Sequence, residues 1–389
     1  MSRLDELISQ YCPNGVEVKK LREVSYMQRG TSLTKAKAVK GDIPVISGGK
    51  EPAFYCNSSN RNGETITVAG SGAGAGYVQY WNIPIFANDC FTVKGNEFAE
   101  TKYLYYFMTN IQDKISDTKK GGGVPHVHIS DVENFSLPVP PLEVQREIVH
   151  ILDNFTELTT ELTAELTARK KQYEFYRNKL LTFDNNVKIV PLADIADIGT
   201  GSSNTNEGLE EGKYPFYVRS QEPLRKNEYE YDETAIITAG DGVGVGKVFH
   251  YIEGKYALHQ RAYRIHINTP DVLPRYYFHY MRAAFLPYIQ KTMFQGSVAS
   301  VRRPMLNKFP VPVPPLDTQK RLVNVLDNFE SICTDLNIGL PAEIEARQKQ
   351  YEYYRDLLLT FAAEGATILT DRQTDRQTDR QTDRQTDRQ

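Results

Sequence analysis

Side chains able to read the edges of nucleic-acid bases gather at several places in the sequence. Arg, Gln, Asn and His suit this chemistry because their donors and acceptors match those that base edges present. The candidates in the N-terminal half are Arg29, Asn88, Asp89, Lys119, Lys120, His126 and His128. Those in the C-terminal half are Arg219, Gln221, His259, Arg261, Arg264, Arg302 and Arg303. Any one of them alone is more often a solvated surface residue, and the sequence does not divide phosphate contacts from base contacts.

Motifs that would carry catalysis or hold a metal are absent from the sequence. The four cysteines (Cys12, Cys56, Cys90 and Cys333) form no CxxC pair, and the seven histidines form no HExxH pair. Neither a Gly-x-Ser-x-Gly elbow nor an Asn/Asp-Pro-Pro-Tyr/Phe methyltransferase tetrad occurs. We therefore predict no catalytic residue, no metal site and no cofactor on this chain.

Alternating glycines follow a β-branched stretch in each half, from Gly70 to Gly76 and from Gly240 to Gly246. A dinucleotide fingerprint needs G-x-G-x-x-G, and Asp241 stands where the first glycine of a phosphate-binding P-loop would be. Glycine at every second position instead indicates close backbone approach. We favour this structural role, and a loop lying against a DNA backbone stays an alternative.

The loop from Lys119 to His128 and the stretch 300–303 hold equivalent places, because each precedes one copy of a long repeat. The copies run from 135 to 155 and from 309 to 329, an offset of 174. Each opens with a Pro-rich segment, which should be extended because proline cannot lie inside a helix. Apolar residues at helical spacing then predict a helix of about 40 residues and about 60 Å in each copy.

The apolar side chains along a helix of that length form a stripe that is too long for one small domain to bury. We therefore predict that the two helical copies pair as an antiparallel coiled coil. For a single copy, an ordinary amphipathic helix on its own domain would be the better interpretation. In the second copy, Gly339-Leu-Pro341 should interrupt the helix, which leaves the pairing register open.

The segments before the helices repeat as well. Each has a strand, a glycine run, two further strands and a Tyr-rich helix, which predicts an α/β (α+β) fold with two similar mixed domains. Leu7-Ile-Ser-Gln resembles Leu180-Leu-Thr-Phe, so the repeat is circularly permuted about a pseudo-twofold and the chain ends should be neighbours. The predicted segments, in chain order, are an N-terminal helix that completes the C-terminal repeat (1–16), a first domain (17–141), a helical region (142–185), a second domain (186–315), a second helical region (316–365) and a disordered tail (366–389).

The charge distribution separates the domains from the helices. A net charge of −3 alone argues against a nucleic-acid binder. Residues 18–140 carry 14 Lys and Arg against 11 Asp and Glu, and residues 186–315 carry 15 against 13. The helical stretches 142–184 and 316–370 carry six against eight and five against nine. This pattern suits DNA on the domains and protein on the helices.

Two further features concern location and the C-terminal tail. No run of eighteen apolar residues and no signal peptide occurs, so we predict a cytoplasmic protein. The tail repeats Thr-Asp-Arg-Gln five times and has no apolar residue, which predicts disorder. Because ACA-GAC-AGA-CAG encodes this unit, we infer a tetranucleotide tract whose slippage would act as a phase-variation switch.

These features together resemble the specificity subunit of type I restriction–modification enzymes. The shared motifs are Pro-Pro-Leu-x-x-Gln from Pro140 and Pro314, the Leu-Asp-Asn-Phe turns, and Lys-Gln-Tyr-x-x-Tyr-Arg ending at Arg177 and Arg355, and the likeness extends from residue 1 to about 365. Three tetrads resemble the Thr-Ala-Glu-Leu repeats of the type IC branch: Thr156, Glu157, Leu158; Thr160, Glu161, Leu162; and Ala164, Glu165, Leu166.

The resemblance implies two target recognition domains, each reading half of a split, asymmetric site in double-stranded DNA. It implies helices that set the spacer and dock two modification subunits, with restriction subunits as further partners. Adenine methylation with S-adenosylmethionine, and cleavage with ATP and Mg, would belong to those partners. A coiled-coil adaptor with two protein-binding domains is the alternative, and a self-contained methyltransferase is less favoured.

Overall fold

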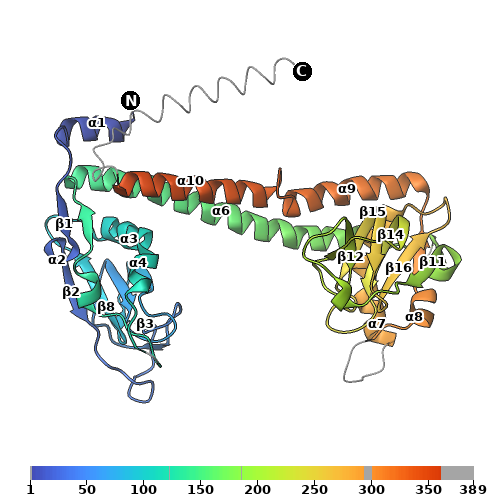
Figure 1. Cartoon of the computed structure of the whole chain (residues 1–389), viewed down its shortest axis with the longest axis horizontal. Helices are drawn as coiled ribbons and strands as arrows, with labels where there is room; N and C mark the ends of the chain where they lie inside the picture. Colours follow the sequence, from blue (N-terminus) through green and yellow to red (C-terminus); the bar gives the residue numbers. More distant parts are fainter. Residues whose placement is uncertain (1, 122, 185, 293–299, 361–389) are drawn as a thin grey trace. The chain divides into compact units, whose positions relative to one another are not determined.

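The computed structural model describes residues 2–121, 123–184, 186–292 and 300–360 (Figure 1). They divide into two compact units. The first contains the chain up to Glu161 and again from Ile344, and the second runs from Leu162 to Glu343. The Thr-Asp-Arg-Gln tail, and with it the predicted disorder, lies outside the described residues.

The first unit contains a mixed α/β domain, as predicted. Its main sheet is antiparallel, in the order β2 (Ser25–Arg29), β8 (Cys90–Gly95), β5 (Thr65–Ala69) and β6 (Val78–Trp81). A smaller sheet has β3 (Ile43–Ile46) between antiparallel β4 (Phe54–Cys56) and parallel β7 (Phe86–Ala87). The Tyr-rich helix α3 (Thr101–Asn110) packs on the main sheet through buried Tyr103 and Leu104. Short helices complete the domain: α2 (Leu21–Val24), α4 (Gln112–Asp117) and α5 (Ile129–Val132).

The second unit contains a similar domain, whose strands form one six-stranded sheet. Its sheet has the order β11 (Ala196–Thr200), β16 (Ala262–Ile267), β14 (Tyr231–Ala239), β15 (Phe249–Leu258), β12 (Tyr214–Tyr217) and β13 (Leu224–Lys226). The β12–β15 pair is parallel and the other pairs are antiparallel. Helix α7 (Pro274–Thr292) packs on β14 and β15, and α8 (Arg303–Asn307) follows.

The glycine runs are tight turns, which confirms the structural interpretation. Gly72 and Gly76 have φ of +81° and +80°, a region that favours glycine. At Gly74 a Cβ atom would lie 2.3 Å from the carbonyl oxygen of Gly48, and at Gly244 it would lie 2.5 Å from that of Arg219. The absence of side chains therefore lets each turn close against a neighbouring loop.

Each Pro-rich segment is extended and joins a domain to a helix, as predicted. β9 (Ser136–Pro138) pairs with β1 (Val18–Lys20), and β17 (Pro310–Val313) pairs with β10 (Lys188–Pro191). The fully buried Gln145 then holds the helix start, since its Nε2 donates to the carbonyl oxygens of Phe98 (2.8 Å) and Pro140 (2.7 Å). Its Oε1 accepts from the amide of Glu100 at 2.9 Å. Gln319 makes the corresponding three bonds in the second unit.

The helices have the predicted lengths and the predicted break. α6 (Leu142–Leu180) has 39 residues. The second copy is divided into α9 (Leu316–Thr334) and α10 (Leu340–Thr360), with Gly339 between them. The tetrad leucines Leu158, Leu162 and Leu166 are half-buried on α6, whereas most of the tetrad Thr and Glu side chains are exposed.

In both units a segment of α6 packs against the second copy of the repeat. Within the first unit Phe155 stacks on Tyr354, and within the second Tyr176 lies beside Phe329. An antiparallel coiled coil about a pseudo-twofold stays a prediction.

The N-terminal helix α1 (Arg3–Tyr11) belongs to the same core as the end of α10, as a circularly permuted repeat requires. Leu4 is buried in one cluster with Leu358 and Leu359. Arg3 also pairs with Glu147 of α6 at 3.3 Å. The two described ends of the chain are therefore parts of one hydrophobic core.

Candidate nucleic-acid interface

In the first unit the structure gathers several of the predicted residues around one open pocket of about 210 Å³. Its lining includes Arg29, Asn88, Asp89, His126 and His128. The two histidine rings are exposed and stack with centroids 6.0 Å apart. A pocket edged by a guanidinium, two imidazoles and a carboxylate can both donate and accept hydrogen bonds.

Backbone bonds from the glycine turn fix the floor of this pocket. The amide of Gly70 donates to the carbonyl oxygen of Asp89 at 3.1 Å, and the amide of Val127 donates to that of Gly70 at 3.1 Å. Ser71 lies in a bridge with His126, and its hydroxyl donates to the Asp89 carboxylate. Three segments far apart in the sequence are thereby held together.

The side chain of Asn88 holds neighbouring segments of this domain together. Its Oδ1 accepts from the amide of Leu33 at 2.8 Å, and its Nδ2 donates to the hydroxyl of Ser47 at 2.9 Å. Both ends of the amide are thus engaged, and the neighbouring Asp89 is the exposed residue.

The two lysines flank the same loop. Lys120 forms a bridge with His126 and an ion pair with Asp131. Burial alone would raise the pKa of Asp131, but the Lys120 ammonium lowers it below its ordinary value. Lys119 is exposed beside it, which suits a phosphate contact.

In the second unit Arg219 and Arg261 meet at one carboxylate. Arg219 Nη1 lies 2.6 Å from Asp241 Oδ1, and Arg261 Nη1 lies 3.2 Å from Asp241 Oδ2. Although burial acts to raise the pKa of Asp241, the two guanidiniums lower it. The two arginine side chains are 40% and 61% exposed, and solvent-exposed ion pairs contribute about 0–1 kcal/mol, so a ligand could recruit Arg261, the more exposed of the two, at little cost.

The turn that carries Asp241 has the backbone bonds of its counterpart. The amide of Gly240 donates to the carbonyl oxygen of Arg261 at 2.9 Å, and the amide of Val301 donates to that of Gly240 at 2.8 Å. This last bond places the exposed Arg302 and Arg303 directly after the site.

Other predicted residues lie elsewhere. Arg264 is only 12% exposed and is paired with Glu233 at 2.9 Å and with Asp197, so the geometry does not favour DNA contact. His259 is 4% exposed, and its Nδ1 accepts from the amide of Arg261 at 3.0 Å. Burial, with Arg219 nearby, lowers the pKa of His259, so it acts as a neutral support. Gln221 lines a separate pocket with Lys247 and Arg282.

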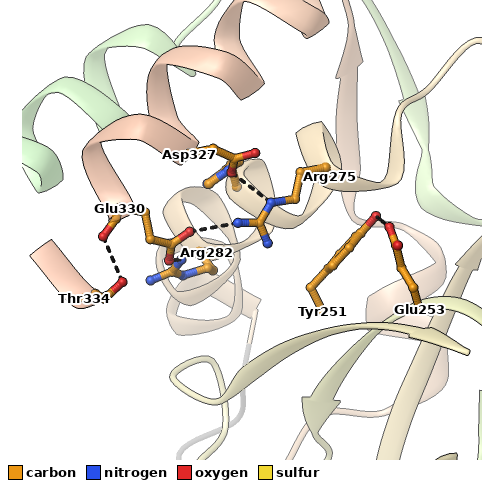
Figure 2. Close-up of polar contacts among 8 residues, drawn as sticks. Tyr251, Glu253, Arg275, Arg282, Asp327, Glu330 and Thr334 are labelled. Atoms are coloured by element: carbon orange, nitrogen blue, oxygen red, sulfur yellow. Dashed lines mark hydrogen bonds and ion pairs between the residues drawn. The ribbon is translucent and has the colours of Figure 1, made fainter. Parts of the chain in front are cut away.

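A polar cluster unseen in the sequence joins α7 to α9 in the second unit (Figure 2). Arg275 Nε lies 2.8 Å from Asp327 Oδ1, and Arg282 pairs with Glu330. His279 Nε2 is 2.7 Å from the same Asp327 oxygen. His279, Asp327 and Glu330 are close enough to hold a metal ion. The two guanidiniums already neutralise both carboxylates, so the cluster is better explained as a structural ion-pair network.

The first unit has a simpler version of this network. Lys102 Nζ lies 2.7 Å from Asp153 Oδ2, and Tyr106 donates to Asp153 Oδ1. Asp153 and Asp327 are the aspartates of the two Leu-Asp-Asn-Phe motifs, for which the sequence predicted turns. The predicted turn is wrong, because both motifs lie within helices, the first in α6 and the second in α9. The aspartate of each motif therefore ties a domain to its helix.

The family described as type I restriction modification DNA specificity domain matches residues 13–169 and 184–346. The chain belongs to this family. Its role is that of a DNA specificity subunit, and the adaptor and methyltransferase alternatives are not favoured. Among the described residues, no helix combines the length and apolar character needed to cross a membrane.

Individual relatives agree with this assignment. A chain named as a type I restriction enzyme specificity subunit of Haemophilus influenzae is 30% identical over 379 residues, which is 89% of this chain and 96% of that one. The EcoR124I/EcoR124II specificity subunit of Escherichia coli is 32% identical over 292 residues, covering 67% and 70%. The crystal structure of an S subunit from M. genitalium has the same fold, with a TM-score of 0.62 at 17% identity, covering 89% of this chain and 97% of that one.

Sequence reasoning missed Ser71 and Asp241 as parts of the two candidate sites of this specificity subunit. Both occupy the second position of a glycine run, between Gly70 and Gly72 or between Gly240 and Gly242. Their place between two glycines of a tight turn was the available signal, because a polar residue there must point away from the backbone.

Proposed function

We propose that this specificity subunit recognises a bipartite DNA site, with each α/β domain reading one half. The observation that carries the proposal is the repeated backbone frame around Gly70 and Gly240, which presents different exposed side chains in the two units. Equal frames with unequal side chains suit two readers of unequal sequences. The recognition domains correspond to residues 17–141 and 186–315, and the exposed Lys119, Lys120, Arg302 and Arg303 supply phosphate contacts.

The helices dock two modification subunits in this proposal. Phe175 and Tyr353 hold equivalent places in the two copies of the repeat and are 62% and 49% exposed. Each ring packs edge-on against the next aromatic residue, with centroids 5.3 Å apart for Phe175–Tyr176 and 5.4 Å for Tyr353–Tyr354. Two alike aromatic surfaces on one chain suit two copies of a single partner.

Catalysis belongs to the partners in this proposal. The chain binds no cofactor of its own, while S-adenosylmethionine, ATP and Mg act in the modification and restriction subunits, in the cytoplasm. With a net charge of −3, the isolated chain neutralises few phosphates and should bind DNA weakly without them.

Methylome sequencing of cells with and without the gene tests the function directly. A split motif of methylated adenines that disappears with the gene is expected, and an unchanged methylome would refute DNA specificity. Docking is tested by measuring the mass of the purified assembly. Phe175→Ala and Tyr353→Ala should each remove one modification subunit, whereas the exposed control Lys188→Ala should remove none.

A further inference from the structure

One backbone position is equivalent in the two sites, and the side chains at this position have opposite charges in the two units. The amide of Asn88 donates to the carbonyl oxygen of Ile46 at 2.8 Å, and the amide of His259 donates to that of Tyr217 at 2.9 Å. The carbonyl oxygen of Asp89 accepts a hydrogen bond from the amide of Gly70, and that of Arg261 accepts one from the amide of Gly240. Asp89 and Arg261 are therefore equivalent, although Gln260 is an additional residue in the second unit.

The next strand begins at the same point in both domains. Cys90 is paired with Ala69, and Ala262 is paired with Ala239. Ala69 and Ala239 are the last residues of the strands that precede the two glycine turns. Asp89 and Arg261 thus both lie immediately before a central strand of a sheet. Side chains in this position start from a rigid element, which suits geometric discrimination.

Both side chains are accessible and are oriented by a partner across the turn. Asp89 is exposed and accepts from the hydroxyl of Ser71, while the Arg261 side chain is 61% exposed and bonds Asp241. Ser71 and Asp241 are themselves equivalent, since each follows the first turn glycine. A donor thus supports the carboxylate in one unit, and an acceptor supports the guanidinium in the other.

We propose that Asp89 and Arg261 are the corresponding specificity residues of the two recognition domains. Asp89 selects a cytosine, because a carboxylate accepts from the cytosine N4 amine. Arg261 selects a guanine, because a guanidinium donates to guanine O6 and N7 together. This inference rests on the proposed function, since it assigns bases within the two half-sites that the domains read.

The test uses the specificity subunit assembled with its modification subunits, and it compares the methylated motifs of wild type, Arg261→Gln and Asp89→Asn. Gln and Asn both pair with adenine, so each variant should accept adenine at one position. The preference for the original base should fall roughly 5- to 150-fold, which corresponds to about 1–3 kcal/mol per base contact. Arg261→Gln should change only the half-site of the second domain, and Asp89→Asn only that of the first.

Each variant is the control for the other, because both measure the same two half-sites. Unchanged motifs at wild-type methylation rates would overturn the proposal, as would a change in the wrong half-site. The proposal would also be overturned by a wild-type motif whose first half contains no C:G pair or whose second half contains no G:C pair. A wild type that methylates no split motif would instead overturn the proposed function.

If a variant no longer methylates, competition binding by the same assembly decides the matter. Duplexes substituted one base pair at a time compete with the wild-type site, and thermal unfolding confirms that the variant is folded. Binding regained with adenine at a single position supports base reading. Equal weakening on every duplex would show a phosphate contact and overturn the proposal.

Discussion

Phe155 stacks on Tyr354 with ring centroids 5.5 Å apart and an interplanar angle of 24°. Phe155 belongs to the first copy of the repeat and Tyr354 to the second. In the other unit the same two motifs meet with the copies exchanged, as Phe329 lies 6.1 Å from Tyr176. Each unit therefore takes one aromatic residue from each copy.

This exchange predicts a measurable coupling. In a double-mutant cycle of Phe155→Leu and Tyr354→Leu, followed by chemical denaturation, the coupling free energy should be about 0.5–1.5 kcal/mol because stacked rings attract beyond their buried area. A cycle pairing Phe155 with Tyr176, far apart on the same helix, should give a coupling near zero. Equal couplings in the two cycles would contradict a local contact.

Gln145 should be among the least replaceable polar residues of the first unit. Gln145→Ala removes three hydrogen bonds and leaves the amide of Glu100 without its partner, so the free energy of unfolding should fall by about 1–3 kcal/mol. Thermal or denaturant unfolding measures this loss. Gln348→Ala, an exposed change on α10, should alter stability by less than about 0.5 kcal/mol. A loss of stability no greater than that of the control would show that Gln145 does not hold the start of α6 in place.

Acid should weaken the link between α7 and α9. Burial, despite the bond to Asp327, lowers the pKa of His279 below 6.5, so the unfolded chain binds this proton more readily than the folded one. Stability from the neutral ring is therefore complete above about pH 6.5 and is lost as the pH falls below it. His250 and His259 have lowered pKa values as well and add to the loss.

The variant His279→Gln isolates the contribution of this residue. Its amide can still donate to Asp327, but it does not titrate. Differential scanning calorimetry between pH 5 and 8 should show the melting temperature of the variant falling less with acid than that of the wild type. Parallel curves for the two proteins would rule out His279 as a source of the acid sensitivity.

The tetrads should set the DNA spacer. One additional Thr-Ala-Glu-Leu unit after Leu166 lengthens α6 by about 6 Å, and the duplex rises 3.4 Å per base pair. We expect the spacer of the methylated motif to grow by one base pair, or at most two, with both half-sites unchanged. The equal-length variant Thr160→Ala should keep the original spacer. Methylation of the original spacing by the extended variant would disprove the ruler.

The sequence predicted the fold well wherever backbone chemistry decides the structure. Proline fixed the extended segments before Leu142 and Leu316, and Gly339 with Pro341 located the break between α9 and α10. Apolar spacing located the 39-residue helix because a surface helix must bury one stripe.

The candidate sites were less predictable because their partners lie far away in the sequence. Arg264 resembles a DNA-reading arginine until the sheet brings Glu233 and Asp197 beside it from two neighbouring strands. The equivalence of Asp89 and Arg261 was hidden because the offset between the two domains grows from 170 at Gly70 and Gly240 to 172 at Asp89 and Arg261, with Gln260 one of the two additional residues. Only strand pairing restores that register.

The glycine turns divide each recognition surface into positions that evolution can change and positions that it cannot. At Gly74 and Gly244 any side chain would collide with a carbonyl oxygen, so substitutions there are removed by selection for folding. The intervening Ala73 and Val243 are exposed and can mutate freely. Under the proposed function, single substitutions at Ala73 and Val243 can therefore alter the DNA preference without disturbing the fold, whereas the buried Ala75 and Val245 are constrained by packing.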